Sequence, residues 1–185
     1  MLLTRNRQCI DSDIRKIVLC GEIARDANAI RIYEDQVLDV RALDLDLLIR
    51  GTSKFLTGGI LDSSNLGVIG LHHGDNNHFR GRPSGFWECY EEERSTSFVI
   101  QKLGEKLDQG DILVVGSINT CKLVSENFLR LHAEAADALL LFVRRLAKEG
   151  VLPEPLRIMS SRAAARRHPS LKILIGYVAQ KWLGK

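Results

Sequence analysis

The chain has 185 residues, of which 45% are hydrophobic and 26% charged, ordinary values for a soluble globular protein. Its net charge of +3 is too small to indicate nucleic-acid binding, and its four cysteines form no C-x-x-C pair, which disfavours a zinc site or a disulfide framework. The first residues lack the apolar core of a signal peptide and no apolar run could cross a bilayer, so we expect one cytoplasmic domain with reduced thiols.

Short apolar runs closed by glycine predict strands in the first half of the chain. The longest is Leu66–Leu71, which reads as a buried strand. Helical periodicity is weak in this half, and Gly58 and Gly59 weaken one of the two helical segments. Strands are expected at 14–20, 45–51 and 66–72, and helical segments at 22–43 and 54–61.

The second half contains the clearest helix. Apolar side chains recur at helical spacing from 122 to 149, and Gly150 and Pro153 end the pattern. Before it we expect a short helix that starts at Pro83, strands at 96–101 and 111–116, and a turn at 107–111. Strands separated by helices predict an α/β fold.

Composition divides the chain into an atypical segment 1–44, an α/β core 45–150 and a basic tail 151–185. From residue 157 onward the tail carries Lys and Arg but no acidic residue, together with apolar residues at helical spacing. We expect a terminal helix that packs on the domain with its basic face in solvent. Contact with an anionic membrane surface is the alternative.

A polar cluster follows the strand at 66–72. It holds three of the five histidines, and its candidate residues are His72, His73, Asp75, Asn76, Asn77, His78 and Arg80. Strand ends of α/β sheets commonly present polar groups to ligands, and His is suited to moving protons near neutral pH. A metal site built from the histidines and Asp75 is a rival hypothesis, disfavoured because adjacent residues of a strand point to opposite faces.

The order of several motifs resembles the formyltransferase catalytic domain. The motifs are 48–56, the strand that ends in His72, Phe79-Arg80-Gly81, and 96–111 with its Leu107-Asp108-Gln109-Gly110 turn. That family includes glycinamide ribonucleotide, methionyl-tRNA and sugar N-formyltransferases. The resemblance implies an α/β fold with a partial Rossmann-like sheet, flanking helices and a basic helical C-terminal tail.

The resemblance also implies a reaction. The family transfers a formyl group from 10-formyltetrahydrofolate to an amine, here an amino sugar on a nucleotide carrier for surface polysaccharide. The family His aligns with His72 and the family Asp with Asp108. A protonated His can stabilise the tetrahedral oxyanion, and a nearby carboxylate can keep it protonated.

The chain departs from the family pattern at two site positions. The family Asn aligns with Gly70, so Asn76 or Asn77 would have to supply its amide, and a second family His is replaced by Gln101. Gln forms hydrogen bonds but cannot carry a proton. The remaining residues expected to contact substrate or folate are His73, Asp75, Arg80 and Lys54.

The family domain opens with a strand, a Gly-rich loop and a helix, whereas Gly21 is the sole glycine before Gly51 in this chain. A shortened domain leaves two alternatives to the transferase. One is a non-catalytic module that binds a partner or membrane through its basic tail. The other is a hydrolase of formyl-folate that uses water as acceptor.

Overall fold

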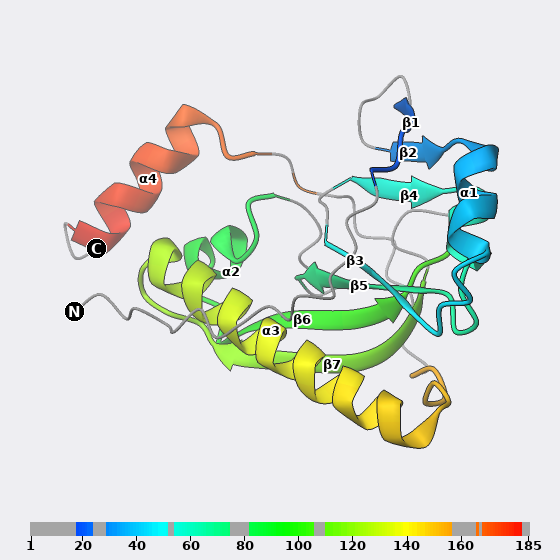
Figure 1. Cartoon of the computed structure of the whole chain (residues 1–185). Helices are drawn as coiled ribbons and strands as arrows, with labels where there is room; N and C mark the ends of the chain where they lie inside the picture. The colour runs from blue at the N-terminus through cyan, green and yellow to red at the C-terminus, as the bar shows by residue number, and fades with distance from the viewer. Residues whose placement is uncertain are drawn as a thin grey trace.

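The computed structural model describes residues 18–23, 29–51, 54–74, 82–105, 110–156, 166 and 168–182. These residues form an α/β structure with two sheets and four α-helices (Figure 1). Within this part of the chain, no helix is both long and apolar enough to cross a lipid bilayer.

The larger sheet has the strand order β3-β5-β6-β7. β3 is parallel to β5, while β5, β6 and β7 form an antiparallel meander. The strands are β3 (Leu48–Arg50), β5 (Val68–His73), β6 (Ser95–Lys102) and β7 (Asp111–Asn119). β3 is therefore an edge strand, and its last residue lies beside Gly70 of β5.

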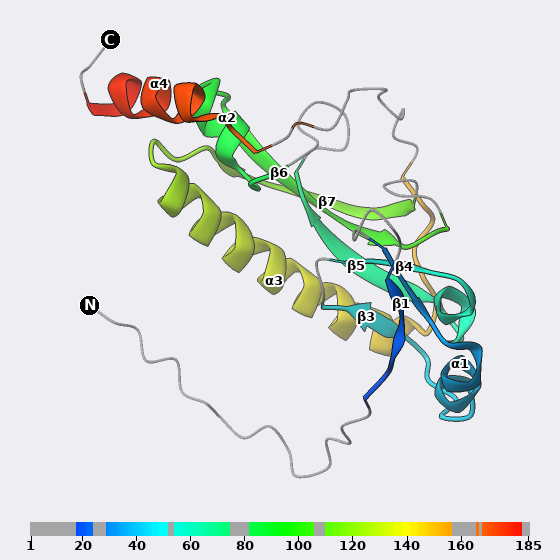
Figure 2. The ribbon, with the colours of Figure 1, turned by 90° about the horizontal axis from the view of Figure 1, so that it is seen from above.

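One long helix, α3 (Val124–Glu149), covers one face of this sheet (Figure 2). Its Phe142 and Leu146 pack against Ile69 and Ile100 of the sheet, and all four side chains are buried. Gly150 ends the helix with a left-handed backbone (φ 71°), a conformation that glycine adopts without strain. The helix expected at 122–149 is thus confirmed.

The smaller sheet has the order β1-β2-β4 and packs with a helix and a 3₁₀ turn. Val37 of the helix and Leu61 of the turn share a core with Val68 of β5, which joins the two sheets. The elements are β1 (Gly21–Ile23), β2 (Ala29–Ile32), β4 (Phe55–Thr57), α1 (Glu34–Arg41) and η1 (Gly59–Asp62).

Four local expectations differ from the structure. The helical segment expected at 22–43 is wrong in part, because Ala29–Ile32 forms β2 and Glu34–Arg41 is the helical part of the described residues in this range. Residues 18–20 are not in a strand, and the first strand is β1. The helix expected at 54–61 is wrong, because Phe55–Thr57 pairs with β2 and only η1 is helical. The short helix α2 (Phe86–Tyr90) begins three residues after Pro83, behind Gly85 in a left-handed conformation.

A buried asparagine connects α3 to β6 and to the start of α2. Asn127 is fully buried, and its Nδ2 donates to the carbonyl of Gly85 and to Oγ1 of Thr96, each at 3.0 Å. Its Oδ1 accepts the backbone N–H of Cys121 at 2.9 Å. The amide thus satisfies a backbone donor and a backbone acceptor that would otherwise be buried without partners.

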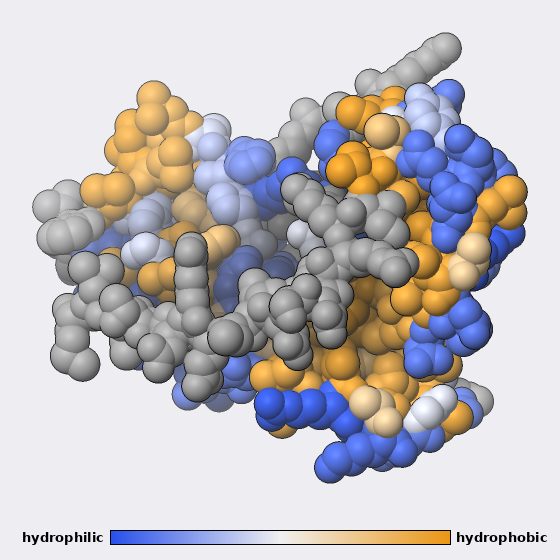
Figure 3. All heavy atoms as spheres, viewed as in Figure 1, coloured by the Kyte–Doolittle hydropathy of each residue, from blue (hydrophilic) through white to orange (hydrophobic). Residues whose placement is uncertain are grey.

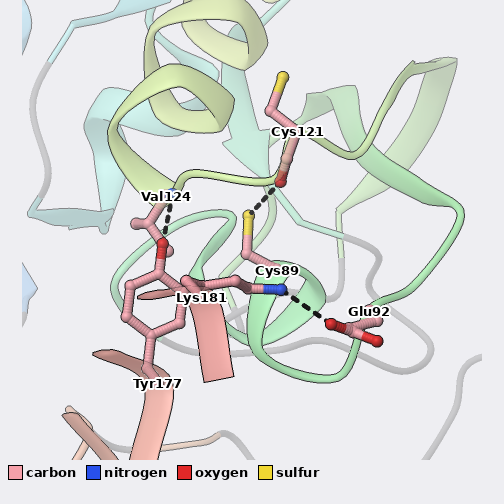
Figure 4. Close-up of polar contacts among 6 residues, drawn as sticks. All are labelled: Cys89, Glu92, Cys121, Val124, Tyr177 and Lys181. Carbon is pink, nitrogen blue, oxygen red and sulfur yellow. Dashed lines mark hydrogen bonds and ion pairs between the residues drawn. The ribbon is translucent and has the colours of Figure 1, made fainter. Parts of the chain in front are cut away.

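The C-terminal helix α4 (Leu171–Trp182) packs beside α2 and the start of α3 (Figure 1). The backbone N–H of Val124 donates to the Tyr177 hydroxyl at 2.9 Å, and Lys181 Nζ lies 3.0 Å from the carboxylate of Glu92 (Figure 4). The Lys181 side chain is only 5% exposed.

The solvent side of α4 is mainly apolar, although Lys172 is also exposed there. Four large apolar residues are exposed along it, and they form part of a hydrophobic area in Figure 3: Leu171, Leu174, Ile175 and Val178. The terminal helix was expected and is present, but the expected orientation of its basic face is wrong at Lys181, because pairing with Glu92 turns this residue inward.

Candidate functional site

The sheet face opposite α3 gathers polar residues from three adjacent strands. Register places Arg50 of β3, Gly70 of β5 and Gln101 of β6 side by side. Ile69 and Ile100, their neighbours in sequence, face α3. Because side chains alternate along a strand, Arg50 and Gln101 face away from α3. Gln101 is 2% exposed, whereas Arg50 and His72 are only partly buried.

His72 extends this polar face by two residues along β5. It is paired with Val99 of β6, and its Nε2 atom is buried. Since the side-chain period of a strand is two, His72 shares the face of Gly70. The sequence prediction that His72 stands at a strand end is therefore confirmed by position, since β5 ends at His73.

The Arg50 guanidinium and the Leu103 side chain border the space above Gly70. A Cβ at Gly70 would lie 3.2 Å from Nε and 3.3 Å from Nη2 of Arg50, and 3.3 Å from Cδ2 of Leu103, all tighter than ordinary van der Waals contact. Nη2 also donates to the Leu71 carbonyl at 3.3 Å. Where the family pattern predicts an Asn side chain, this chain therefore has a glycine and a neighbouring arginine.

His73 lies on the opposite face of β5 and stacks on a histidine of α3. The rings of His73 and His132 are 3.9 Å apart and nearly parallel, and His132 Nδ1 lies 2.8 Å from the Phe128 carbonyl. Burial, with the nearby His132 and His72, lowers the pKa of His73 to about 4. His73 is therefore neutral at pH 7 and helps to hold β5 on α3. Its expected contact with substrate stays a prediction.

Acidification is expected to destabilise the fold through His73. Its pKa of about 4 in the folded protein is below the ordinary 6.5, so the unfolded chain binds the proton more readily. His73 therefore leaves the free energy of unfolding unchanged above pH 6.5 and lowers it as the pH drops from 6.5 towards 4. His73→Phe keeps a ring against His132 and is expected to flatten this part of the profile, measured by urea denaturation at several pH values.

The matched control is His168→Phe, because His168 is an exposed histidine just before α4. Its profile should follow that of the unmodified protein. A profile of the His73 variant that remains as steep as that of the unmodified protein would show that His73 does not cause the acid sensitivity.

Other predicted residues lie in the second sheet or outside the described part of the chain. Lys54 is half-buried and directly precedes β4 of the smaller sheet. The predicted roles of Lys54 and Gln101 as binding residues stay predictions. Asp75, Asn76, Asn77, Arg80 and Asp108 lie outside the described residues, and so does His78.

Cys89 is unsuited to act as a nucleophile. Burial, with Glu88 and Cys121 nearby, raises the pKa of its thiol to about 12, so the reactive thiolate is absent at neutral pH. Its Sγ donates to the Cys121 carbonyl at 3.2 Å (Figure 4). The thiol is a packed structural group.

The sequence did not single out Arg50 as a candidate site residue. The available signal was a cationic residue that ends the apolar run Leu47-Leu48-Ile49 at the carboxyl end of a predicted strand. In α/β sheets that edge is where ligands bind. Its partnership with Gly70 depends on strand pairing, which local sequence does not reveal.

No protein-family model and no curated protein matches the chain. Solved structures do. A sugar N-formyltransferase from a Shewanella species has a TM-score of 0.60 at 15% identity, and the match covers 78% of this chain and 63% of that one. A protein of Mycobacterium tuberculosis described as a candidate sugar N-formyltransferase has a TM-score of 0.57 at 12% identity and covers 78% of this chain and 66% of that one.

A third match is the phosphoribosylglycinamide formyltransferase of Campylobacter jejuni, with a TM-score of 0.51, 21% identity and coverage of 61% of this chain and 60% of that one. The chain therefore has the fold of formyltransferases, as the order of its motifs predicts. It spans slightly less than two thirds of the length of these neighbours.

Proposed function

We propose that this protein transfers a formyl group from 10-formyltetrahydrofolate to an amine. The observation that carries the proposal is the polar sheet face of Arg50, His72 and Gln101, which is formed at the end of β5 in a chain with the formyltransferase fold. Strand ends of this kind are where α/β sheets bind their ligands. A formyl group passed to an amine needs donors for its oxygen and a carrier for one proton, and these side chains supply both functions.

The reaction forms one carbon–nitrogen bond and breaks another. The acceptor amine attacks the formyl carbon, and the carbonyl electron pair moves to the oxygen of a tetrahedral intermediate. Collapse of this intermediate breaks the bond to the folate nitrogen, which takes up the proton lost by the amine. We assign this proton movement to His72, with Asp108 as its charged partner, because an imidazole can accept and donate near neutral pH.

The acceptor proposed is an amino sugar on a nucleotide carrier. Among the similar structures reported above, one is described as a sugar N-formyltransferase and one as a candidate for that activity, which supports this class of substrate. Asn76 and Asn77 are proposed to help hold the formyl oxygen. His73, Asp75, Arg80, Lys54 and Gln101 are proposed to bind the acceptor or the folate. The reaction would take place in the cytoplasm.

The test is a formyl-transfer assay with the purified protein. It is incubated with 10-formyltetrahydrofolate and a panel of nucleotide-linked amino sugars, and formamide products are detected by mass spectrometry. We expect one amine to be formylated with release of equal tetrahydrofolate. Tetrahydrofolate release that needs no amine would instead establish the hydrolase, and neither product would contradict both activities.

A non-catalytic binding module is the second candidate. It is favoured by the exposed apolar residues of α4. Calorimetric titration with a non-reactive folate analogue separates the two. Binding supports the transferase, whereas no heat of binding at millimolar analogue supports the module.

A further inference from the structure

The Arg50 guanidinium lies beside the peptide that joins Leu71 to His72. β3 ends at Arg50, so the next carbonyl along β5, that of Leu71, is taken by the side chain of Arg50. Gly70 leaves room for the guanidinium, because a Cβ there would lie 3.2 Å from its Nε, closer than ordinary van der Waals contact. The register of β3 on β5 therefore determines that Arg50 lies beside Gly70.

We infer that Arg50 is a catalytic residue that donates hydrogen bonds to the oxygen of the transferred formyl group. The inference rests on the proposed function. The guanidinium binds the carbonyl of Leu71, and His72 is the residue that follows this carbonyl on β5. An oxygen bound to both side chains would be stabilised by the permanent positive charge of Arg50, while His72 moves the proton.

A guanidinium is chemically suited to this position. It carries five N–H donors in one plane and stays protonated at every physiological pH, so it can hold a backbone carbonyl and a second oxygen together. Hydrogen bonds from a charged donor to a developing oxyanion strengthen as the charge forms, and they are stronger in a site that excludes water. Gln101 is paired beside Gly70 and is 2% exposed, so this part of the face is shielded from solvent.

The competing explanation is structural. In that case Arg50 only fastens the end of edge strand β3 to β5 through the Leu71 carbonyl. Removing it would then reduce stability and the amount of folded protein, and the folded fraction would keep its turnover. An oxyanion role lowers kcat and kcat/KM together in folded protein, because the contact exists in the transition state.

The test compares the unmodified protein with Arg50→Met, Arg50→Lys, Gly70→Asn and Arg50→Met/Gly70→Asn. Met removes the charge and retains most of the stem, so we expect kcat to fall about a hundredfold or more. Lys keeps a charge without the planar fork and should give an intermediate rate. In the double variant an Asn amide enters the space left by the guanidinium and should restore kcat about tenfold over Arg50→Met.

Two controls accompany the kinetics. Arg130→Met removes an exposed arginine of α3 that is paired with Glu126, and it should leave kcat unchanged. Thermal unfolding of every variant gives the folded fraction. Gly70→Asn alone places its amide against Arg50 and should reduce kcat, because two groups then compete for one space.

The outcomes separate the two proposals. No formyl transfer by the unmodified protein contradicts the proposed function and removes the role of Arg50 with it. Transfer by the unmodified protein together with an Arg50→Met rate within about threefold contradicts the role of Arg50 alone. A loss that follows the folded fraction, with no recovery in the double variant, assigns Arg50 to the structural role and also overturns the inference.

Discussion

Replacing His72 by glutamine is expected to lower kcat for formyl transfer by about a hundredfold or more. Glutamine keeps hydrogen-bonding capacity and similar length but cannot take up and return a proton. His72 stands on the polar face of β5 beyond Gly70, where the proposed transfer occurs. The rate is measured with saturating formyl donor and the amine identified in the substrate panel.

His168→Gln provides the matched control, since the same substitution is made at an exposed histidine before α4. It should leave kcat unchanged. Addition of imidazole should partly restore the smaller variant His72→Ala, because a free base can enter the space that the side chain leaves. Unchanged turnover in both His72 variants would exclude His72 from the proton transfer.

Replacing Asn127 by alanine is expected to lower the free energy of unfolding by about 3 kcal/mol, because each buried polar group left without a partner costs ~1–3 kcal/mol. The substitution removes the acceptor of the Cys121 N–H and a donor to the Gly85 carbonyl, both at a fully buried position. Urea denaturation followed by circular dichroism measures the change.

Asn65→Ala is the control for this substitution. Asn65 is exposed, and its Nδ2 reaches the carboxylate of Asp46 only at 3.4 Å, so the expected change is below about 0.5 kcal/mol. Equal effects of the two substitutions would show that the buried amide network contributes little to stability. A large effect at Asn127 alone would show that the hydrogen bonds of this side chain hold α2, β6 and α3 together.

Elements with strong local patterns were predictable from the sequence. The helix expected at 122–149 is α3 at Val124–Glu149, and the strand expected at 96–101 is β6 at Ser95–Lys102. Gly150 fixes the end of α3 by its left-handed backbone, a local property of the residue. Periodicity, together with such end signals, is encoded over a few neighbouring residues.

Elements that depend on distant partners were not predictable in the same way. Phe55–Thr57 becomes β4 because it pairs in parallel with Ala29–Arg31, more than twenty residues earlier. The sequence predicted a helix at 54–61, weakened by the two glycines that follow Thr57. The orientation of α4 likewise depends on Glu92, which gives Lys181 its ion pair. Neither partner is visible in the local sequence.

The candidate site shows the same difference between residues with a local signal and residues that depend on strand pairing. His72 could be selected because it follows an apolar strand in a His-rich stretch, a local pattern. Arg50 could not, because its relation to Gly70 arises from the parallel register of β3 on β5. The sequence indicated a missing amide at Gly70 but not the cation that fills the space.

The short pairing of β3 with β5 is a weak point of the candidate site. β3 pairs with β5 through only three residues at the edge of the sheet, whereas β5 is also paired through five residues with β6. A short edge pairing with few contacts opens locally at lower cost than the interior of a sheet. Opening of β3 alone would therefore separate Arg50 from His72 while β5, β6 and β7 stay paired.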